Sequence, residues 1–317
     1  MATKKIITVF GATGAQGGSV VKSILGDAKM KEAWTVRGVT RDTSKPSAKA
    51  LESLGAETVA ADLNDAASVK AAIKGSYAVF GVTNYWEKQS KEAEFQQGKA
   101  MADGAKEAGV QHFVWSSLPN VTKLSNGALT GVEHFDSKAQ VEEYLRESGI
   151  PSSFFMPGFY MSNLPGGMFR QQPTGEYAFS LPIPGSSPIP LFDSEDDTGK
   201  FVKGILLNRE KVLGKRILAA SRYYTCDEIV ELFKQTFPES GKNAKYNELP
   251  HTVFKGAMIS FGRSEFAAEE LLQNMRLLNE FGYYGGEPLE ESKEILEEPA
   301  TTWEEYMKKA KAFAELK

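Results

Sequence analysis

Three glycines near the N-terminus have a spacing that suits a phosphate-binding turn. Gly11, Gly14 and Gly17 follow a short apolar, β-branched run and open a segment with helical spacing. A side chain there would keep the backbone from turning sharply and approaching a pyrophosphate, and the helix N-terminus offers free N–H groups to the phosphates. The spacing is G-x-x-G-x-x-G instead of the commoner dinucleotide-binding motif G-x-G-x-x-G, so the glycines match that motif in their physical role and not in their spacing. The alternative is a tight turn that binds no ligand. The other residues of the turn that we expect at a dinucleotide are Thr13, Ala15 and Gln16.

The end of the next strand-like run indicates which dinucleotide this turn would hold. NAD sites place an acidic residue there, where it accepts from the ribose 2′-hydroxyl. Here the run ends at Arg41, with Lys45 just beyond, and a guanidinium suits a 2′-phosphate through charge-assisted hydrogen bonds. We therefore expect NADP(H) as the cofactor. Asp42 could cap the following turn, and the alternative for Arg41 is a solvated loop charge.

Two later strand ends carry further candidates for the cofactor site. Asp62 and Leu63 follow the third strand, where dinucleotide folds usually meet the adenine edge, although Asp62 also reads as part of a helix start capped by Asp65. The fourth strand ends at the carboxyl edge, where ligands bind in open α/β sheets. Its aromatic residues could instead only cover the sheet edge. The candidates there are Thr83, Asn84 and Tyr85.

A helical segment over residues 133–147 presents a basic residue on its apolar side. At about 100° per residue, His134, Lys138, Val141 and Leu145 share one narrow stripe, and acidic residues take the opposite side. A buried, unpaired ammonium is costly, so Lys138 needs a partner, which a cofactor ribose could provide. An imidazole can act as a general acid near neutral pH. A lone inward-facing histidine is more often a hydrogen-bonded core residue, and the sequence favours that interpretation of His134.

These residues must be held by the elements around them, and strand and helix patterns alternate from the start of the chain. Strands are expected at 6–10, 35–40, 57–60, 77–82, 112–116 and 152–156, and helices at 14–25, 49–54, 66–73, 92–108 and 133–147. Near-continuous apolar strands alternating with helices indicate a parallel sheet covered on both faces. We therefore predict an α/β, doubly wound parallel-sheet Rossmann domain.

The pattern changes after residue 157. The stretch 157–190 is rich in proline, glycine and aromatic residues and is expected to be irregular. Helical patterns return at 196–207, 226–236, 252–281 and 302–313. We predict a Rossmann domain over 1–157, completed by 191–215, and a smaller, mostly helical α/β substrate or partner lobe over 158–190 and 216–317.

Composition sets limits on the class of protein. The 317 residues are 41% hydrophobic and 25% charged, with a net charge of −4 and a pI near 5.7. This charge balance lacks the excess of basic residues that direct nucleic-acid binding normally needs. No apolar run approaches the ~18 residues of a membrane span. The only cysteine is Cys226, so no disulfide and no cysteine-based metal site is expected. The N-terminal residues lack the pattern of a signal peptide, and we expect a cytoplasmic protein, with the nucleus as a second location.

The chain resembles the NmrA-like family, an atypical branch of the short-chain dehydrogenase/reductase superfamily. The resemblance covers almost the whole chain, is dense over residues 1–165, and is closest to the animal NADPH-sensing members. It implies a Rossmann domain, a preference for NADP and, for some members, redox sensing through partner proteins. The stretches that carry it are Val9–Gly18, Val39–Arg41, Val82–Glu87, His134–Lys138 and Asn279–Tyr283.

The resemblance also implies a set of catalytic residues, from which this chain departs. Active members of the superfamily use Ser, Tyr and Lys, the tyrosine exchanging a proton with the carbonyl oxygen and the lysine holding the nicotinamide ribose. Here Ser116 or Ser117 could supply the serine, and Lys138 is in place, but His134 stands where the tyrosine would be. Tyr160 and Asn163 match the segment that closes over the nicotinamide, although they could form only a turn.

Two functions follow as expectations. In the first, the protein is a redox sensor with weak or no dehydrogenase activity, whose NADPH or NADP⁺ state is read by a regulatory protein partner. In the second, it is an NADPH-dependent reductase of a small carbonyl, imine or enone. The missing tyrosine favours the sensor, and the aromatic, Met-rich loop 154–169 favours a small-molecule pocket. A homodimer is compatible with both.

Overall fold

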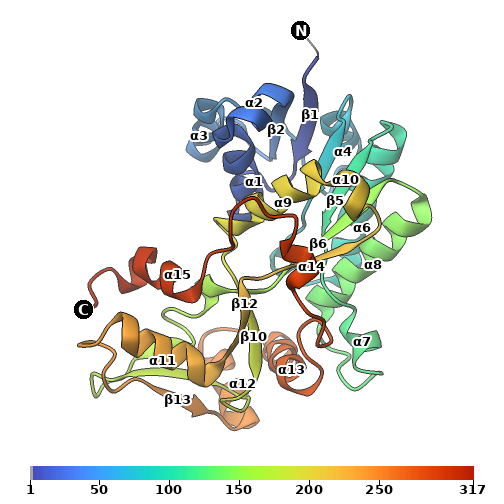
Figure 1. Cartoon of the computed structure of the whole chain (residues 1–317). Coiled ribbons are helices and arrows are strands. Elements are labelled where there is room, and N and C mark those ends of the chain that lie inside the picture. The colour runs from blue at the N-terminus through green and yellow to red at the C-terminus, as the bar shows by residue number, and fades with distance from the viewer. Residues whose placement is uncertain (1–2) are drawn as a thin grey trace.

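The computed structural model describes residues 3–317, which form two bodies, one above the other in Figure 1. The first body, the Rossmann domain, is built on seven parallel strands in the order β11-β6-β5-β4-β1-β2-β3. The strands are β1 (Lys5–Val9), β2 (Trp34–Thr40), β3 (Glu57–Ala60), β4 (Ala78–Gly81), β5 (His112–Ser116), β6 (Ser152–Pro157) and β11 (Arg216–Ala219). The α/β, parallel-sheet prediction is therefore confirmed.

Helices cover both faces of this sheet because its central strands are buried on both sides. One face packs on α1 (Ala15–Gly26) and α9 (Asp197–Leu207), with Val20, Ile24 and Phe201 in its core. The other packs on α4 (Ala66–Ile73), α6 (Lys91–Glu107) and α8 (Glu133–Ser148), through Met101 and Val141. Shorter helices fill the connections: α2 (Ala28–Ala33), α3 (Pro46–Leu54), α5 (Tyr85–Lys88), α7 (Val121–Leu124) and α10 (Arg209–Val212). No helix within residues 3–317 is long and apolar enough to cross a membrane.

The second body, called the second lobe here, lies below the Rossmann domain in Figure 1. It contains two three-stranded sheets, β12-β10-β7 and β13-β9-β8, around a large apolar core. Its strands are β7 (Phe159–Tyr160), β8 (Phe169–Gln171), β9 (Tyr177–Leu181), β10 (Pro188–Phe192), β12 (Arg222–Thr225) and β13 (Lys245–Glu248). Its helices are η1 (Met161–Asn163), α11 (Cys226–Thr236), α12 (His251–Ser260), α13 (Glu265–Glu280), α15 (Trp303–Lys309) and η2 (Lys311–Phe313). The short helix α14 (Glu290–Lys293) packs on β11 of the Rossmann domain, where the Ser292 hydroxyl accepts from the Leu218 backbone N–H at 2.8 Å.

One sequence prediction is wrong here, and another is refined. The stretch 157–190 is not irregular throughout, because β9 pairs with β13 from more than 60 residues further along the chain, a partner that local composition does not reveal. The helical pattern expected over 252–281 is present but is divided between two helices, α12 and α13. The chain turns at Gly262, whose φ is +85°, and Ser264 caps the second helix by accepting from the Ala267 backbone N–H at 3.1 Å.

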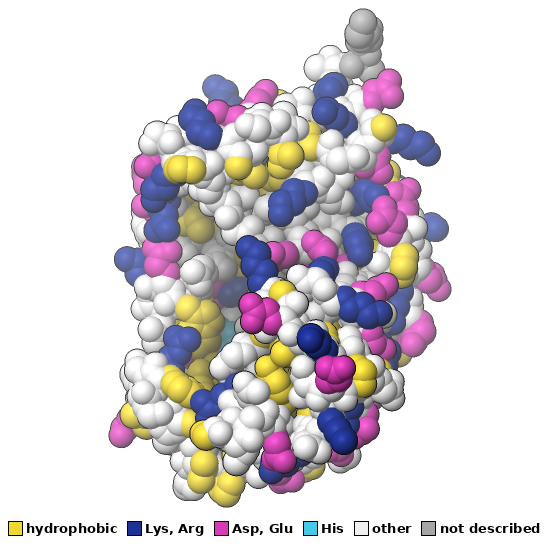
Figure 2. All heavy atoms as spheres, turned by 90° about the vertical axis from the view of Figure 1, so that its left-hand side faces the viewer, with side chains coloured by type: hydrophobic (Ala, Val, Ile, Leu, Met, Phe, Trp, Pro, Cys, Tyr) yellow, Lys and Arg dark blue, Asp and Glu magenta, His cyan; other side chains and the backbone are white. Residues whose placement is uncertain are grey.

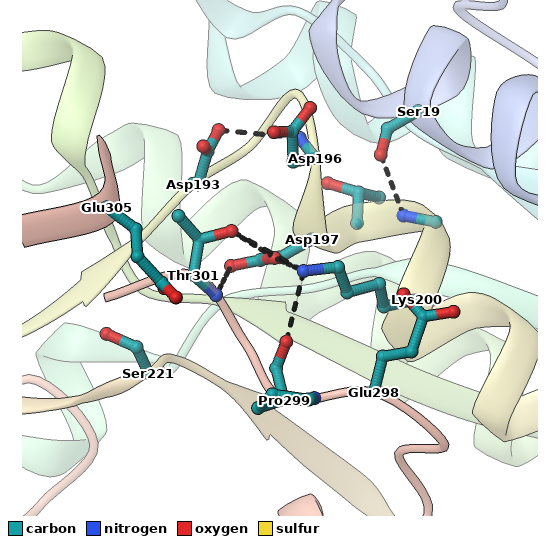
Figure 3. Close-up of polar contacts among 12 residues, drawn as sticks. Ser19, Asp193, Asp196, Asp197, Lys200, Ser221, Glu298, Pro299, Thr301 and Glu305 are labelled. Carbon is teal, nitrogen blue, oxygen red and sulfur yellow. Dashed lines mark hydrogen bonds and ion pairs between the residues drawn. The ribbon is translucent and has the colours of Figure 1, made fainter. Parts of the chain in front are cut away.

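A segment near the C-terminus ties the two bodies together (Figure 3). Asp197, at the start of α9, is fully buried and accepts hydrogen bonds from the backbone N–H and the hydroxyl of Thr301, both at 2.9 Å. Lys200 also pairs with Asp197 and donates to the backbone oxygen of Pro299. Burial raises the pKa of Asp197, and the contacts from Lys200 and Thr301 oppose that rise. Two residues later, the Trp303 N–H donates to the Tyr224 hydroxyl of the second lobe.

One histidine lies in the interior of the sheet. His112 opens β5 and is fully buried, with its Nε2 2.9 Å from the Ser153 hydroxyl oxygen. That hydroxyl donates to the Val212 backbone oxygen, so the histidine must donate through Nε2. Nδ1 is buried without a partner among residues 3–317, and burial lowers the pKa of His112 to about 4. The folded protein therefore holds this imidazole neutral.

We expect His112 to make the fold acid-sensitive. Its pKa is below the 6.5 of the unfolded chain, so the unfolded state binds the proton more tightly and stability is lost as the pH falls from about 6.5 towards 4. At about 1.4 kcal/mol per pKa unit, the full loss is on the order of 3 kcal/mol. Urea unfolding of His112→Gln at several pH values should show a flatter slope than the parent, whereas His251→Gln, at an exposed histidine, should not. Equal slopes for the parent and His112→Gln would contradict this assignment.

Candidate functional site

A cleft of about 510 Å³ opens at the carboxyl edge of the parallel sheet, where the Rossmann domain meets the second lobe. The cleft lies at the topological switch point of the sheet, where the strand order reverses. There β1 lies between β2 and β4, and the chain continues outward to β3 on one side and to β5 on the other. The loops after β1, β4 and β6 form one part of its lining, and α8 and α13 complete it. Figure 2 shows the face on which the molecule is hollowed between its upper and lower parts.

The glycine turn separates into structural and ligand-facing positions. Gly11 has a φ of +62°, which favours glycine, and a Cβ on Gly17 would lie 2.3 Å from the Gly11 oxygen. A Cβ on Gly14 would meet the same oxygen only at 3.4 Å, an ordinary contact. Gly14 is also the N-cap of α1, which has no side-chain cap and no acidic residue in its first turn. The free N–H groups of α1 therefore remain available to an anion in the cleft. Thr13 is exposed in the turn but does not line the cleft.

The two basic residues predicted for a 2′-phosphate lie on the rim, outside the cleft lining. Arg41 is exposed and its Nη1 lies 2.7 Å from Oε1 of Glu87, on α5. Lys45 is exposed at the N-cap of α3. Asp42 accepts from the backbone and hydroxyl of Ser44, so it caps the local turn, and these hydrogen bonds lower its pKa.

The third strand end is occupied by local hydrogen bonds. Asp62 accepts from the backbone and the side chain of Asn64, both at 2.8 Å, and these bonds lower its pKa. Asp65 caps α4 by accepting from the Ala67 N–H at 3.0 Å. Neither Asp62 nor Leu63 lines the cleft.

The fourth strand end does line the cleft. Thr83, Asn84 and Tyr85 all contribute to the lining, followed by Trp86. Tyr85 is buried, and its hydroxyl donates to Glu133 at 3.1 Å. Burial, together with the nearby carboxylates of Glu270 and Glu133, raises the pKa of Tyr85 well above its usual value, so its phenol stays neutral.

Lys138 lines the cleft and has a partner inside the protein. Its Nζ lies 2.5 Å from Oε1 of Glu94, which is buried on α6. The same carboxylate accepts from the Thr83 hydroxyl at 2.6 Å and from the Ser137 hydroxyl. The partner that a lysine on this stripe requires is therefore supplied by Glu94, and the ammonium is held at the cleft wall.

His134 is hydrogen-bonded, as expected of an inward-facing histidine, and its partner is a carboxylate from the other body. Its Nδ1 lies 2.7 Å from Oε1 of Glu270 on α13, and its backbone N–H donates to the same oxygen at 2.8 Å. The Glu270 side chain is 1% exposed and that of His134 is 13% exposed. The imidazole also contacts the rings of Trp86 and Phe135, with centroids 5.0 and 4.8 Å away, and lines the cleft.

Asn274 lies one helical turn after Glu270 and also lines the cleft. It is 6% exposed, and its amide Nδ2 has no hydrogen-bond partner among residues 3–317. Buried amide groups are normally paired, so a donor left free at a cleft wall marks a position for a ligand acceptor. Tyr283 and Phe135 form the apolar surface beside it, and their ring centroids are 5.3 Å apart.

Three of the remaining predicted residues, Ser116, Gln16 and Tyr160, are joined by hydrogen bonds next to the glycine turn. The Ser116 hydroxyl donates to Oε1 of Gln16 at 2.8 Å, and Nε2 of Gln16 donates to the Tyr160 hydroxyl at 2.5 Å. Desolvation raises the pKa of Tyr160. Gln16, Tyr160 and the exposed Asn163 line the cleft, whereas Ser116 is buried behind it. Ser117 is also buried and donates to Glu142 at 2.6 Å.

The two buried glutamates, Glu94 and Glu270, and Asn274 were not among the residues predicted from the sequence. Glu94 begins a stripe on α6 that continues through Gly98 and Met101, all buried. Glu270 and Asn274 are spaced as neighbours on the buried face of α13. In both helices, an acidic residue at a position that the helical periodicity assigns to the buried face is the feature that could have identified these glutamates from the sequence.

Comparison with known proteins gives a consistent family. A model of the NmrA-like family matches residues 3–307. The NmrA-like family domain-containing oxidoreductase malD of Malbranchea aurantiaca is 35% identical over 265 residues, which are 79% of this chain and 77% of the relative. The oxidoreductase cpsB of Aspergillus campestris is 32% identical over 306 residues, covering 90% of this chain and 87% of the relative.

Solved structures share the fold at lower identity. NmrA, a negative transcriptional regulator crystallised in complex with NADP, superposes with a TM-score of 0.80 at 21% identity, covering 99% of this chain and 96% of its own. The NADPH-dependent quinone oxidoreductase QOR2 of Escherichia coli, crystallised with NADPH, gives 0.74 at 21% identity, covering 94% and 97%. The family match spans both bodies described above, and the chain belongs to the NmrA-like family.

Proposed function

We propose that this protein binds NADP(H) and uses it to reduce a small carbonyl, imine or enone compound. The observation that carries the proposal is the extent of the cleft. It runs from the free N-terminus of α1, past Lys138, to aromatic and amide groups of the second lobe. A site that only bound a dinucleotide would not require that second part.

The residues present fit a dinucleotide. The free N–H groups at the start of α1 suit a pyrophosphate, and the space beside Gly14 lets a phosphate approach the backbone. Lys138 is placed to bond a ribose hydroxyl, and Arg41 with Lys45 could hold a 2′-phosphate at the rim. Bound NADPH would supply a hydride, and NmrA and QOR2 were each crystallised with NADP or NADPH.

The apolar end of the cleft supports turnover of a small molecule. Trp86, Phe135 and Tyr283 provide flat surfaces, and Asn274 provides an unpaired donor. Small-molecule sites commonly combine a mostly apolar wall with a few placed polar groups. The named relatives malD and cpsB are both described as oxidoreductases.

The direct test is NADPH oxidation with a defined panel of acceptors: 4-nitrobenzaldehyde, 9,10-phenanthrenequinone, 2-methyl-1-pyrroline and cyclohex-2-enone. We expect at least one acceptor to be reduced catalytically, with product confirmed by mass spectrometry. Tight NADPH binding without turnover of any of these compounds would contradict the reductase proposal and favour the sensor.

A redox sensor is the second candidate, and one observation favours it. Arg41 is paired with Glu87 and Lys138 with Glu94, so a cofactor that binds these cations must compete with both carboxylates. Because Glu87 is an exposed residue of α5, cofactor binding would alter the surface around it, which a partner protein in the cytoplasm or nucleus could read. Different protease sensitivity of α5 with NADPH and with NADP⁺ would support this role.

Arg41→Asp is expected to abolish the preference for NADPH over NADH. Losing a charge-assisted hydrogen bond to the 2′-phosphate should weaken NADPH binding roughly 10- to 150-fold and leave NADH binding nearly unchanged. Fluorescence titration measures both affinities. Lys49→Asp, on exposed α3, is the matched control for loss of local positive charge. An unchanged NADPH affinity in Arg41→Asp would show that this arginine does not contact the phosphate.

Gly14→Val and Gly17→Val are expected to fail in different ways. The Gly14 position has room for a Cβ within the fold, so Gly14→Val should stay folded and lose NADPH binding, because its side chain occupies the pyrophosphate position. Gly17→Val meets the Gly11 backbone and should lower the free energy of unfolding by on the order of 1–3 kcal/mol or more. Denaturant unfolding and NADPH titration distinguish the two. Normal NADPH binding by Gly14→Val would mean that the turn has only a structural role.

A further inference from the structure

We propose that His134 is the proton donor of the reductase, that Glu270 positions it, and that Asn274 holds the acceptor atom of a carbonyl substrate. The proposal rests on the reductase function above. It departs from the interpretation of His134 as a core residue, because this histidine lines the cleft and is bonded to a buried carboxylate from the other body.

The geometry determines which ring nitrogen faces the reaction. Oε1 of Glu270 accepts from the backbone N–H of His134 at the N-terminus of α8, a helix without a side-chain cap. Because the same acceptor oxygen faces the ring, Nδ1 of His134 carries the proton that it donates to Glu270. Nε2 has no partner among residues 3–317 and is the nitrogen left to exchange a proton with a ligand. This is the orienting role that a carboxylate has beside a catalytic histidine.

Packing restricts the imidazole further. The rings of Trp86, Phe135 and Tyr85 have centroids within 6 Å of the imidazole centroid, at 5.0, 4.8 and 5.9 Å. The guanidinium carbon of Arg263 lies over the Trp86 ring, 5.8 Å from its centroid. A ring held by aromatic contacts and a carboxylate keeps its donor direction without reorganisation during the reaction.

Asn274 adds the second donor. It lies four residues after Glu270, so both side chains project from the same face of α13. Its Nδ2 is buried, unpaired and at the cleft wall, where a carbonyl oxygen could accept from it. Three other side chains that line the cleft already have partners: Tyr85 donates to Glu133, Tyr283 donates to the Pro157 backbone oxygen, and Lys138 pairs with Glu94.

The reaction balances as a carbonyl reduction. The carbonyl carbon gains a C–H bond from the hydride that NADPH supplies, and the C=O π electron pair moves onto oxygen. That oxygen takes the Nε2 proton of the imidazolium, which leaves neutral His134 with its Nδ1 proton still bonded to Glu270. The products are an alcohol and NADP⁺, and solvent returns one proton to His134.

The test compares variants in NADPH-dependent reduction of 4-nitrobenzaldehyde and 9,10-phenanthrenequinone. His134→Gln should lower kcat roughly 10²- to 10⁴-fold, with NADPH affinity within a few-fold of the parent. Glu270→Gln should lower kcat and leave the KM of NADPH unchanged, because the imidazole loses the carboxylate that orients it. Its matched control is Glu269→Gln, the neighbouring glutamate that pairs with Lys255 at the surface, which should leave kcat unchanged. Asn274→Leu should raise the KM of the carbonyl substrate roughly 3- to 10-fold and leave that of NADPH unchanged.

A second measurement does not depend on activity. ¹⁵N-histidine NMR of the full chain above pH 8 should show His134 as the Nδ1–H tautomer, and His134→Gln assigns the signal. The Nε2–H tautomer would overturn the proposed pair. Turnover that survives in His134→Gln would overturn the proton-donor role while the reductase function stands. No turnover of either carbonyl compound by the parent would overturn the proton-donor role in carbonyl reduction, whichever tautomer is found, and the reductase function falls with it only if the imine and the enone are not reduced either.

Discussion

Buried carboxylates determine how the elements around the cleft meet. An ionised acid removed from water must be given hydrogen-bond donors, and here the donors come from different parts of the chain. Glu94 joins α6 to α8 and to the end of β4, and Glu270 joins α13 to the start of α8. Glu142 accepts from Ser117, Arg146 and Arg216, and so joins α8 to the carboxyl end of β5 and to β11.

These acids are also the reason that the site residues are ordered before any ligand arrives. Lys138 and His134 sit one turn apart on α8, and each is held by a glutamate from a different helix. Removing one member of such a pair leaves the other buried without a partner, which is strongly destabilising. Substitutions that retain a neutral hydrogen-bonding group are therefore more informative about this cleft than truncations to alanine.

The elements with local signals were predictable. Helix α4 has the predicted bounds of 66–73, and the glycine turn lies between β1 and α1 as its spacing indicated. The positions of Lys138 and His134 on the inner stripe of α8 also followed from periodicity.

What could not be predicted depends on contacts between distant segments. No local rule links Glu270 to His134, 136 residues away, or β13 to β9. The turn that divides α12 from α13 needed one left-handed glycine and one serine cap, a weak signal within an otherwise helical pattern. Cofactor preference and the roles at the cleft depend on such pairings, so residue types alone left several alternatives open.

The C-terminal connection through Asp197, Thr301 and Trp303 has a thermodynamic consequence. Separating the two bodies would remove Thr301 from the fully buried Asp197 and leave that carboxyl group without two of its donors. Because a buried acid without donors is costly, neither body can open far while the other stays intact. The chain should therefore unfold as one cooperative unit, in which amide protection gained by a ligand at the sheet edge extends to the far helices of the second lobe.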